Sequence, residues 1–180
     1  DYVALLPQSA RQVDFVELFG GVGGVVKVRI TRGRCPGGNF DLVTGWDLLN
    51  PIHAKAFAND VNKYKPKVIV MAPPCTYLTE FARIWGHKWV DFEKKVNDAK
   101  KLAKVCALAA HLQLDGGRHF IIENPCGSLL FLYEPILSLC SATSVFSTTF
   151  EQCAYGLMAP GGLDIEYMQK RTTMISNMHD

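Results

Sequence analysis

Apolar and polar residues follow two patterns along this chain: short continuous apolar runs and longer stretches with helical spacing. The short runs are bounded by glycine, proline or polar turn residues and predict strands. Helical spacing is strongest over residues 89–114, where apolar residues recur every three or four positions and lysines fall between them. The predicted strands cover 13–19, 39–43, 67–72, 119–125, 144–150 and 172–176, and the predicted helices cover 52–62, 89–114 and 129–140.

Strands that alternate with helices are typical of an α/β fold with a mainly parallel sheet, and the length suits one domain over residues 1–180. Residues 20–24, GGVGG, predict a tight turn, and 25–33 predict a helix or a second short element. Ligands of such sheets bind at the carboxyl ends of the strands. Glycines, acids, prolines and a cysteine all follow predicted strand ends here, so we expect them to converge on one edge.

Composition narrows the class of protein only modestly. The chain is 48% hydrophobic and 20% charged, which suits a globular domain with a substantial core. Its net charge of +2 permits nucleic-acid binding without requiring it. The basic clusters at 27–34 and 63–67 are interpreted as solvated surface. No run of 18 apolar residues and no signal peptide is visible, so no membrane partner is expected.

The cysteines indicate the redox setting. None of the six belongs to a CxxC pair, so neither a structural metal site nor a secreted disulfide framework is expected. Reduced thiols favour an intracellular location, in the nucleus of a eukaryote or otherwise in the cytoplasm. The chain begins at Asp1 rather than methionine, and we interpret it as a fragment or a processed piece.

The glycine turn after the first strand is a candidate ligand site, because glycines let a ligand approach the backbone. It does not fit a dinucleotide fingerprint, since Val26 stands where the third glycine belongs, and no Walker lysine follows. Asp41 ends the next strand and could accept hydrogen bonds from ribose hydroxyls, while Asp47 could accept from an exocyclic amine. Both aspartates could instead cap a turn or a helix.

Cys75 and Glu123 are the candidate reactive groups. Pro73 and Pro74 fix the backbone before Cys75, which would present the thiol at the rim of the sheet. If a helix began immediately afterwards, its N-terminus would lower the pKa of this thiol and favour a nucleophile. Glu123 ends an apolar strand, where partial burial would raise its pKa and suit it to proton transfer. Structural roles, a core cysteine and a capping or salt-bridged glutamate, are the alternatives.

Four segments in this order resemble the catalytic core of DNA cytosine-5 methyltransferases. They are ELFGGVGG (17–24), APPC (72–75), ENP (123–125) and a late region containing AYG and QKR (154–156 and 169–171). The resemblance spans about residues 13–176. It implies a Rossmann-like class I methyltransferase fold with three α/β/α layers, S-adenosylmethionine as cofactor and DNA rather than RNA as the partner.

The same resemblance implies a role for each matching residue. The target cytosine is flipped out of the stack, Cys75 adds to C6 of the ring, and Glu123 holds and protonates N3. Asn124 would brace the cysteine loop, and Arg171 would contact the base or its phosphate. The implied lining of the cofactor pocket is Phe19, Gly21, Gly23, Asp41, Asp47 and Pro74.

Several positions depart from the family pattern. Thr76 replaces the usual glutamine after the cysteine, Pro125 replaces valine, and Thr173 replaces the second arginine of the late motif. No segment that would read DNA sequence is present, so a recognition domain or a polyprotein neighbour is an expected partner. PPCT and Gln152-Cys153-Ala154-Tyr155-Gly156 resemble compact methylase-like domains of mobile-element polyproteins.

Three alternatives remain open at this point. An amino-methyltransferase would need a polar residue at Ala72 and an aromatic residue at Cys75, and both are missing. An RNA cytosine-5 methyltransferase would take its nucleophile from the later motif, where Cys126 lies. A catalytically decayed module that only binds nucleic acid or cofactor is the third alternative.

Overall fold

The structure is a computed structural model that describes residues 13–25, 27, 34–159 and 166–178. A single mixed sheet of six strands runs through the described residues, with helices between the strands. The strands are β1 (Phe15–Leu18), β2 (Pro36–Phe40), β3 (Val68–Met71), β4 (His119–Pro125), β5 (Phe146–Glu151) and β6 (Arg171–Ser176). The helices are α2 (Pro51–Tyr64), α3 (Glu80–Trp85), α4 (Phe92–Asp115) and α5 (Glu134–Cys140). Short 3-10 helices are η1 (Leu42–Thr44), η2 (Gly86–Lys88), η3 (Leu129–Leu132) and η4 (Gln152–Tyr155).

The strand order is β2-β1-β3-β4-β6-β5. The first four of these strands are parallel to one another, whereas β6 is antiparallel to both β4 and β5. The predicted α/β fold with a mainly parallel sheet is therefore confirmed, and the arrangement is compatible with a Rossmann-like fold. The chain adds β2 on one side of β1 and β3 on the other, so the order of the strands reverses beside β1. In open α/β sheets ligands bind at such a reversal.

Successive side chains of each strand point to opposite faces of the sheet. Leu18, Ile69, Met71 and Ile122 are fully buried against the helices. α4 contributes a face of small residues to this core, including Ala103 at 0% exposure, which lets the helix approach the strands closely. Burial of this apolar surface supplies most of the stability of the layer, at about 25 cal/mol per Å².

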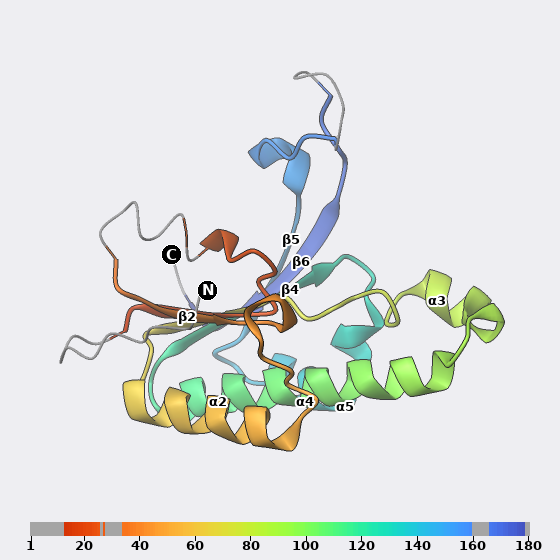
Figure 1. Cartoon of the computed structure of the whole chain (residues 1–180). Helices are drawn as coiled ribbons and strands as arrows, with labels where there is room; N and C mark the ends of the chain where they lie inside the picture. Colours follow the sequence, from red (N-terminus) through yellow and green to blue (C-terminus); the bar gives the residue numbers. More distant parts are fainter. Residues whose placement is uncertain (1–12, 26, 28–33, 160–165, 179–180) are drawn as a thin grey trace.

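The helices α2 to α5 do not form two layers, and residues 24, 25 and 27 belong to a further helix whose other residues lie outside the described part of the chain. α2, α4 and α5 lie on one face of the sheet, and α3 lies to the side of the sheet (Figure 1). On the opposite face the described residues leave a hollow of about 200 Å³, lined in part by Phe15, Val68, Val70 and Ile121. The expected α/β/α sandwich is therefore shown only as one helical layer on a sheet within the described part of the chain.

Most predicted elements are present, with four differences. The strand expected at 39–43 ends at Phe40, because Asp41 caps η1 with a capping box that closes on Thr44. The helix expected at 89–114 begins at Phe92, and its predicted end is confirmed near Asp115. The helix expected at 129–140 is divided into η3 and α5. α3 was not predicted, and residues 26 and 28–33 of the expected element at 25–33 lie outside the described residues.

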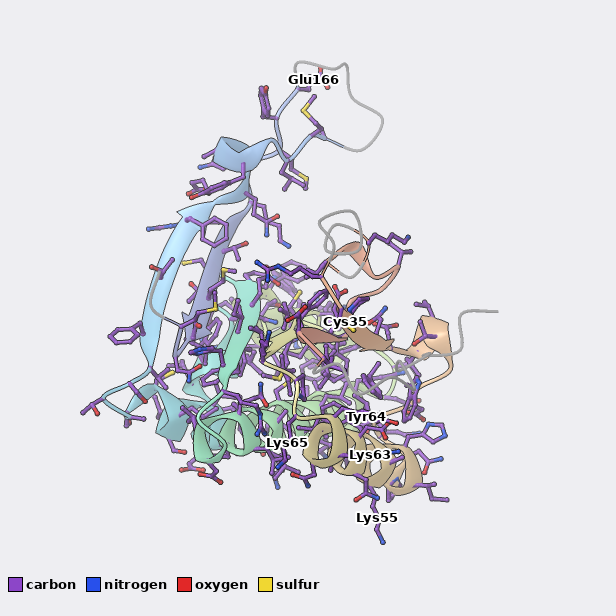
Figure 2. The ribbon with its side chains drawn as sticks, turned by 90° about the vertical axis from the view of Figure 1, so that its left-hand side faces the viewer. Cys35, Lys55, Lys63, Tyr64, Lys65 and Glu166 are labelled. Atoms are coloured by element: carbon purple, nitrogen blue, oxygen red, sulfur yellow. The ribbon has the colours of Figure 1, made fainter. Side chains whose placement is uncertain are left out.

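The β5–β6 hairpin continues beyond the sheet. A bridge between Met158 and Tyr167 and a hydrogen bond from Ala159 N to Glu166 O extend the pairing past the strands. Figure 2 places Glu166 at the outer end of this extension, far from the helical layer on which Lys55 and Lys63 lie. The end of β5 and the start of β6, from which this extension leaves the sheet, lie at the carboxyl edge beside the end of β4.

Candidate functional site

The predicted convergence on one edge of the sheet is confirmed by the strand register. Leu18 pairs with both Phe40 and Met71, and Met71 pairs with Ile122, so the carboxyl ends of β1 to β4 meet at the same level. The glycine turn, the Pro-Pro-Cys loop and Glu123-Asn124 consequently lie next to one another in that order. β6 begins at this edge and β5 ends there, which adds Arg171 and Gln152 to it.

The glycine turn is clamped by the end of β2. Gly21 N donates to Asp41 Oδ2 at 2.9 Å, and the other oxygen of this carboxylate accepts from Val43 N at 3.0 Å. Asn39 holds the turn from the same strand, because its Nδ2 donates to Gly21 O at 2.8 Å. The alternative role of Asp41, as a helix cap, is therefore confirmed, and its role toward a ribose stays a prediction. Asn39 was not predicted, and no local pattern distinguishes it.

Two features of the turn explain its sequence. Gly21 and Gly23 have positive φ angles of 54° and 72°, which glycine adopts without strain. A Cβ at Gly21 or Gly24 would meet no described residue within 4 Å, so no described side chain covers this backbone. A Cβ at Gly20 would instead overlap the side chain of Glu17. Phe19 also has a positive φ, of 58°, which is unusual for a bulky residue and is typical of functional turns.

Asp47 is less directly engaged with the turn. Its Oδ1 accepts from Leu49 N at 3.0 Å, and its backbone N–H donates to His53 Nδ1 at 3.0 Å. The ring of His53 lies 5.8 Å from that of Trp46, which packs on Phe40. The structure therefore places Asp47 in a local turn beside an aromatic cluster.

The Cys75 loop is held at both ends by the chain that leaves β4. Before the cysteine, Asn124 Nδ2 donates to Pro73 O at 2.8 Å. After it, Ser128 Oγ and Leu129 N donate to Leu78 O at 3.1 Å and 2.7 Å. The expected contact of Asn124 with this loop is present, whereas the contribution of Ser128 was not predicted. Pro74 is exposed at the tip of the loop.

The thiol of Cys75 does not lie at a helix N-terminus. Cys75 O accepts from Leu78 N at 2.8 Å in a turn, and α3 begins only at Glu80 with Thr79 as its N-cap. The condition on which a helix would have activated this thiol is therefore not met. Cys75 is half-buried, while Cys126 is exposed.

Glu123 and Asn124 point to opposite faces of β4, as adjacent strand residues do. Asn124 is 1% exposed on the helical side, and its Oδ1 has no hydrogen-bond partner among the described residues. Glu123 is partly exposed on the other face, where Gln152 Nε2 donates to Glu123 Oε1 at 3.3 Å. Lys170 Nζ lies 3.7 Å from the same oxygen. Asn124 thus braces the cysteine loop, whereas Glu123 forms an ion pair with Lys170, which is the salt-bridged role that was its alternative.

Arg171 begins β6 beside the end of β4. Its side chain is 66% exposed, and its Nε lies 3.8 Å from Glu151 Oε1. Its carbonyl accepts from Cys126 N at 2.9 Å, which fixes the turn after Glu123-Asn124-Pro125. The guanidinium is therefore exposed at this edge beside the carboxylate of Glu151, and its contact with a base or phosphate stays a prediction.

Two of the other cysteines lie in the helical layer, Cys106 in α4 and Cys140 at the end of α5. Cys126 and Cys153 lie near the carboxyl edge, after the ends of β4 and β5. Burial raises the pKa of the Cys106 thiol far above its usual range and also raises the pKa of Cys140. Lys63 packs on the ring of Tyr64, and Figure 2 shows both on the helical layer. Among the described residues, no three His, Cys, Asp or Glu side chains are grouped as a metal site would require. No helix in the described parts of the chain is long and apolar enough to cross a membrane.

Comparison with known proteins adds no family to this picture. No protein-family model matches the chain, and no curated protein matches its sequence. The class that the fold and the site define is therefore an α/β domain with a glycine turn, a clamped cysteine and a carboxylate at one sheet edge.

Proposed function

We propose that this domain transfers a methyl group from S-adenosylmethionine to C5 of cytosine in DNA, with Cys75 as the nucleophile. The observation that carries the proposal is the double clamp on the Cys75 loop. Asn124 and Ser128, on either side of the turn that follows Glu123, hold the loop at Pro73 and Leu78. The clamp holds the loop that carries the thiol beside the strand end that carries the carboxylate, which suits a reaction that needs both groups at one ring.

The glycine turn fits the proposed cofactor. No described side chain covers its backbone at Gly21 and Gly24, where a Cβ would occupy the volume that a ligand needs. Asp41 already accepts two backbone N–H groups, and each carboxylate oxygen keeps acceptor capacity for a ribose hydroxyl. In this proposal Phe19 and Gly23 also line the cofactor, and Asp47 and Pro74 would contact it from neighbouring loops. When bound there, S-adenosylmethionine supplies the methyl group in electrophilic form.

In the proposed reaction each residue at the carboxyl edge has a separate role. The Cys75 thiolate forms a bond to C6, and the electron pair of the C5–C6 bond moves toward C5. Glu123, as the acid, shares its proton with N3, which takes up the charge that attack develops. C5 would take the methyl group as the methyl bond to the cofactor sulfur breaks and its electron pair stays on that sulfur. The C5 proton then leaves to solvent, its electron pair re-forms the C5–C6 double bond, N3 returns its proton to Glu123, and the bond between Cys75 sulfur and C6 breaks. Asn124 keeps the loop in place, and exposed Arg171 contacts the flipped base or its phosphate.

The test uses oligonucleotides that contain 5-fluorocytosine, because fluorine at C5 cannot leave as a proton and the covalent adduct persists. The protein is incubated with labelled S-adenosylmethionine and with matched DNA or RNA strands, and adducts are counted by mass spectrometry. We expect an adduct with DNA that is lost in Cys75→Ser and kept in Cys126→Ser.

Other outcomes identify the rival functions. An adduct on RNA that depends on Cys126 would support an RNA methyltransferase, since Cys126 is the exposed thiol of the later motif. Cofactor binding without any adduct would indicate a binding module. Failure to bind S-adenosylmethionine would reject the proposed function.

A further inference from the structure

We infer that Gln152 is a positioning residue for Glu123, an inference that rests on the proposed function for its catalytic meaning. Gln152 follows β5, and its side chain crosses β6 to reach the carboxylate on β4. Its Nε2 donates to Glu123 Oε1 at 3.3 Å and to Thr172 Oγ1 at 2.8 Å. The two hydrogens of one amide are thereby both used.

The register explains why these three side chains form a row. Thr172 pairs with Pro125 on β4 and with Phe150 on β5. Side chains two residues apart on a strand share a face, so Thr172 lies on the same face as Glu123 and Gln152. Thr172 is fully buried, and its hydroxyl is a fixed acceptor for the amide. The backbone of Gln152 is also fixed, because its N–H donates to Lys170 O at 2.9 Å. An amide anchored at two points can hold a third group in a defined orientation.

The contact has a direct consequence for Glu123. A carboxylate on a partly exposed strand end rotates freely unless one oxygen is held. Gln152 and the Lys170 ammonium both lie at Oε1, at 3.3 Å and 3.7 Å, so Oε2 is the oxygen left to face a substrate. Thr173 does not take part, since its hydroxyl is paired with Thr149 Oγ1 at 2.9 Å.

The experiment compares Gln152→Leu with Thr149→Val in the full chain. Leucine keeps the approximate volume of Gln152 and removes its donor, whereas Thr149→Val removes a hydrogen bond from the same hairpin without touching Glu123. Adduct formation on 5-fluorocytosine DNA is followed at saturating and at low DNA concentration. We expect Gln152→Leu to lower the maximal rate by about 10- to 100-fold, the range for a hydrogen bond to a charged group. The DNA concentration at half-maximal rate and the cofactor affinity should stay unchanged, and Thr149→Val should resemble the wild type.

A maximal rate in Gln152→Leu equal to that of the wild type would overturn the inference, as would an equal loss in both variants, which would indicate hairpin stability alone. A second readout needs no activity: the side-chain amide protons of Gln152 are followed by NMR through a pH titration. We expect them to shift as Glu123 takes up a proton, and to lose this shift in Glu123→Gln. If the wild type forms no adduct but shows the titration, the proposed reaction fails and the positioning contact stands. If the titration is absent, the positioning contact is wrong.

Discussion

Cys75 and Cys106 are the same residue type in two different environments of the molecule. Cys106 lies within α4, fully buried against the sheet, and burial raises the pKa of its thiol. Cys75 lies in a loop at the carboxyl edge of the sheet, half-buried and fixed through Pro73 and Leu78. Cys106 acts as a small apolar residue of the core, whereas Cys75 is partly open to solvent at the edge.

The difference shows what the two regions contribute. The helical layer is stabilised mainly by apolar area removed from water. At the edge, strands end and backbone groups must be paired by side chains such as Asn124, Ser128 and Asp41. Those same side chains fix the loops in position, so stabilising the edge also organises the candidate site.

Thiol modification should separate the two cysteines most strongly. We expect iodoacetamide to alkylate Cys75 in the folded protein, while Cys106 reacts only after global opening, about 1000-fold or more slowly for a domain of ordinary stability. Peptide mapping by mass spectrometry measures both rates in one sample and keeps the exposed Cys126 separate. Rapid alkylation of Cys106 under native conditions would show that the helical layer is not closed around it.

Serine substitution should reveal the same contrast in stability. Cys106→Ser places a hydroxyl in an apolar core and should lower the free energy of unfolding by about 1–3 kcal/mol. Cys75→Ser changes a half-buried loop position and should stay within about 0.5 kcal/mol of the wild type. Urea denaturation followed by circular dichroism gives both values, and equal losses would mean that Cys75 is also a core residue.

The elements that could be predicted are those whose signal lies within one segment. The apolar runs of β3 and β4 and the period of α4 each record burial along a single stretch of chain, and these predictions are confirmed. The order of the site along the sheet edge followed from the parallel topology. The end of β2 could not be read from hydrophobicity, because the capping box at Asp41 prevails over the apolar run that continues into η1.

The contacts that organise the site were mostly beyond prediction. Ser128 reaches Leu78 across 50 residues of sequence, and Gln152 reaches Glu123 across 29. Such pairs depend on the register of strands and on the exact end of a loop, neither of which leaves a local pattern. Asn124 is the exception, since the resemblance itself implied that it braces the cysteine loop.

Removing the clamp on the glycine turn should have a moderate effect. Asp41→Ala deletes the acceptor of both Gly21 N and Val43 N and should cost about 0.5–2 kcal/mol of unfolding free energy, as the loss of a helix cap does. Asp47→Ala, which loses only the acceptor of Leu49 N, should cost less. Urea denaturation measures stability, and isothermal calorimetry should show weaker binding of S-adenosylmethionine to Asp41→Ala. A larger loss in Asp47→Ala would mean that the aromatic cluster around Trp46, rather than Asp41, organises this part of the edge.

The smallest expected effect on stability comes from an ion pair at the amino ends of the parallel strands. Lys67 Nζ lies 2.7 Å from Asp14 Oδ1, and Cys35 N donates to Asp14 Oδ2 at 2.8 Å. The hydrogen bond from Lys67, followed by that from Cys35, lowers the pKa of Asp14. A lowered pKa means that the folded state binds this proton less readily than the unfolded state, so the stabilisation is present at neutral pH and disappears as the pH falls through the folded pKa.

Asp14→Asn should therefore cost less than about 1 kcal/mol at pH 7, because solvent screens a pair this exposed. Lys67 itself is 51% exposed. The difference from the wild type should shrink as the pH falls below about 4, where the unfolded aspartate also begins to protonate. Urea denaturation at pH 7, 5 and 3.5 measures it, with Asp98→Asn as the control for an exposed ion pair on a helix. A difference that grew toward acid pH would mean that Asp14 is held in its protonated form, and the amino edge would then resemble the buried layer rather than an open surface.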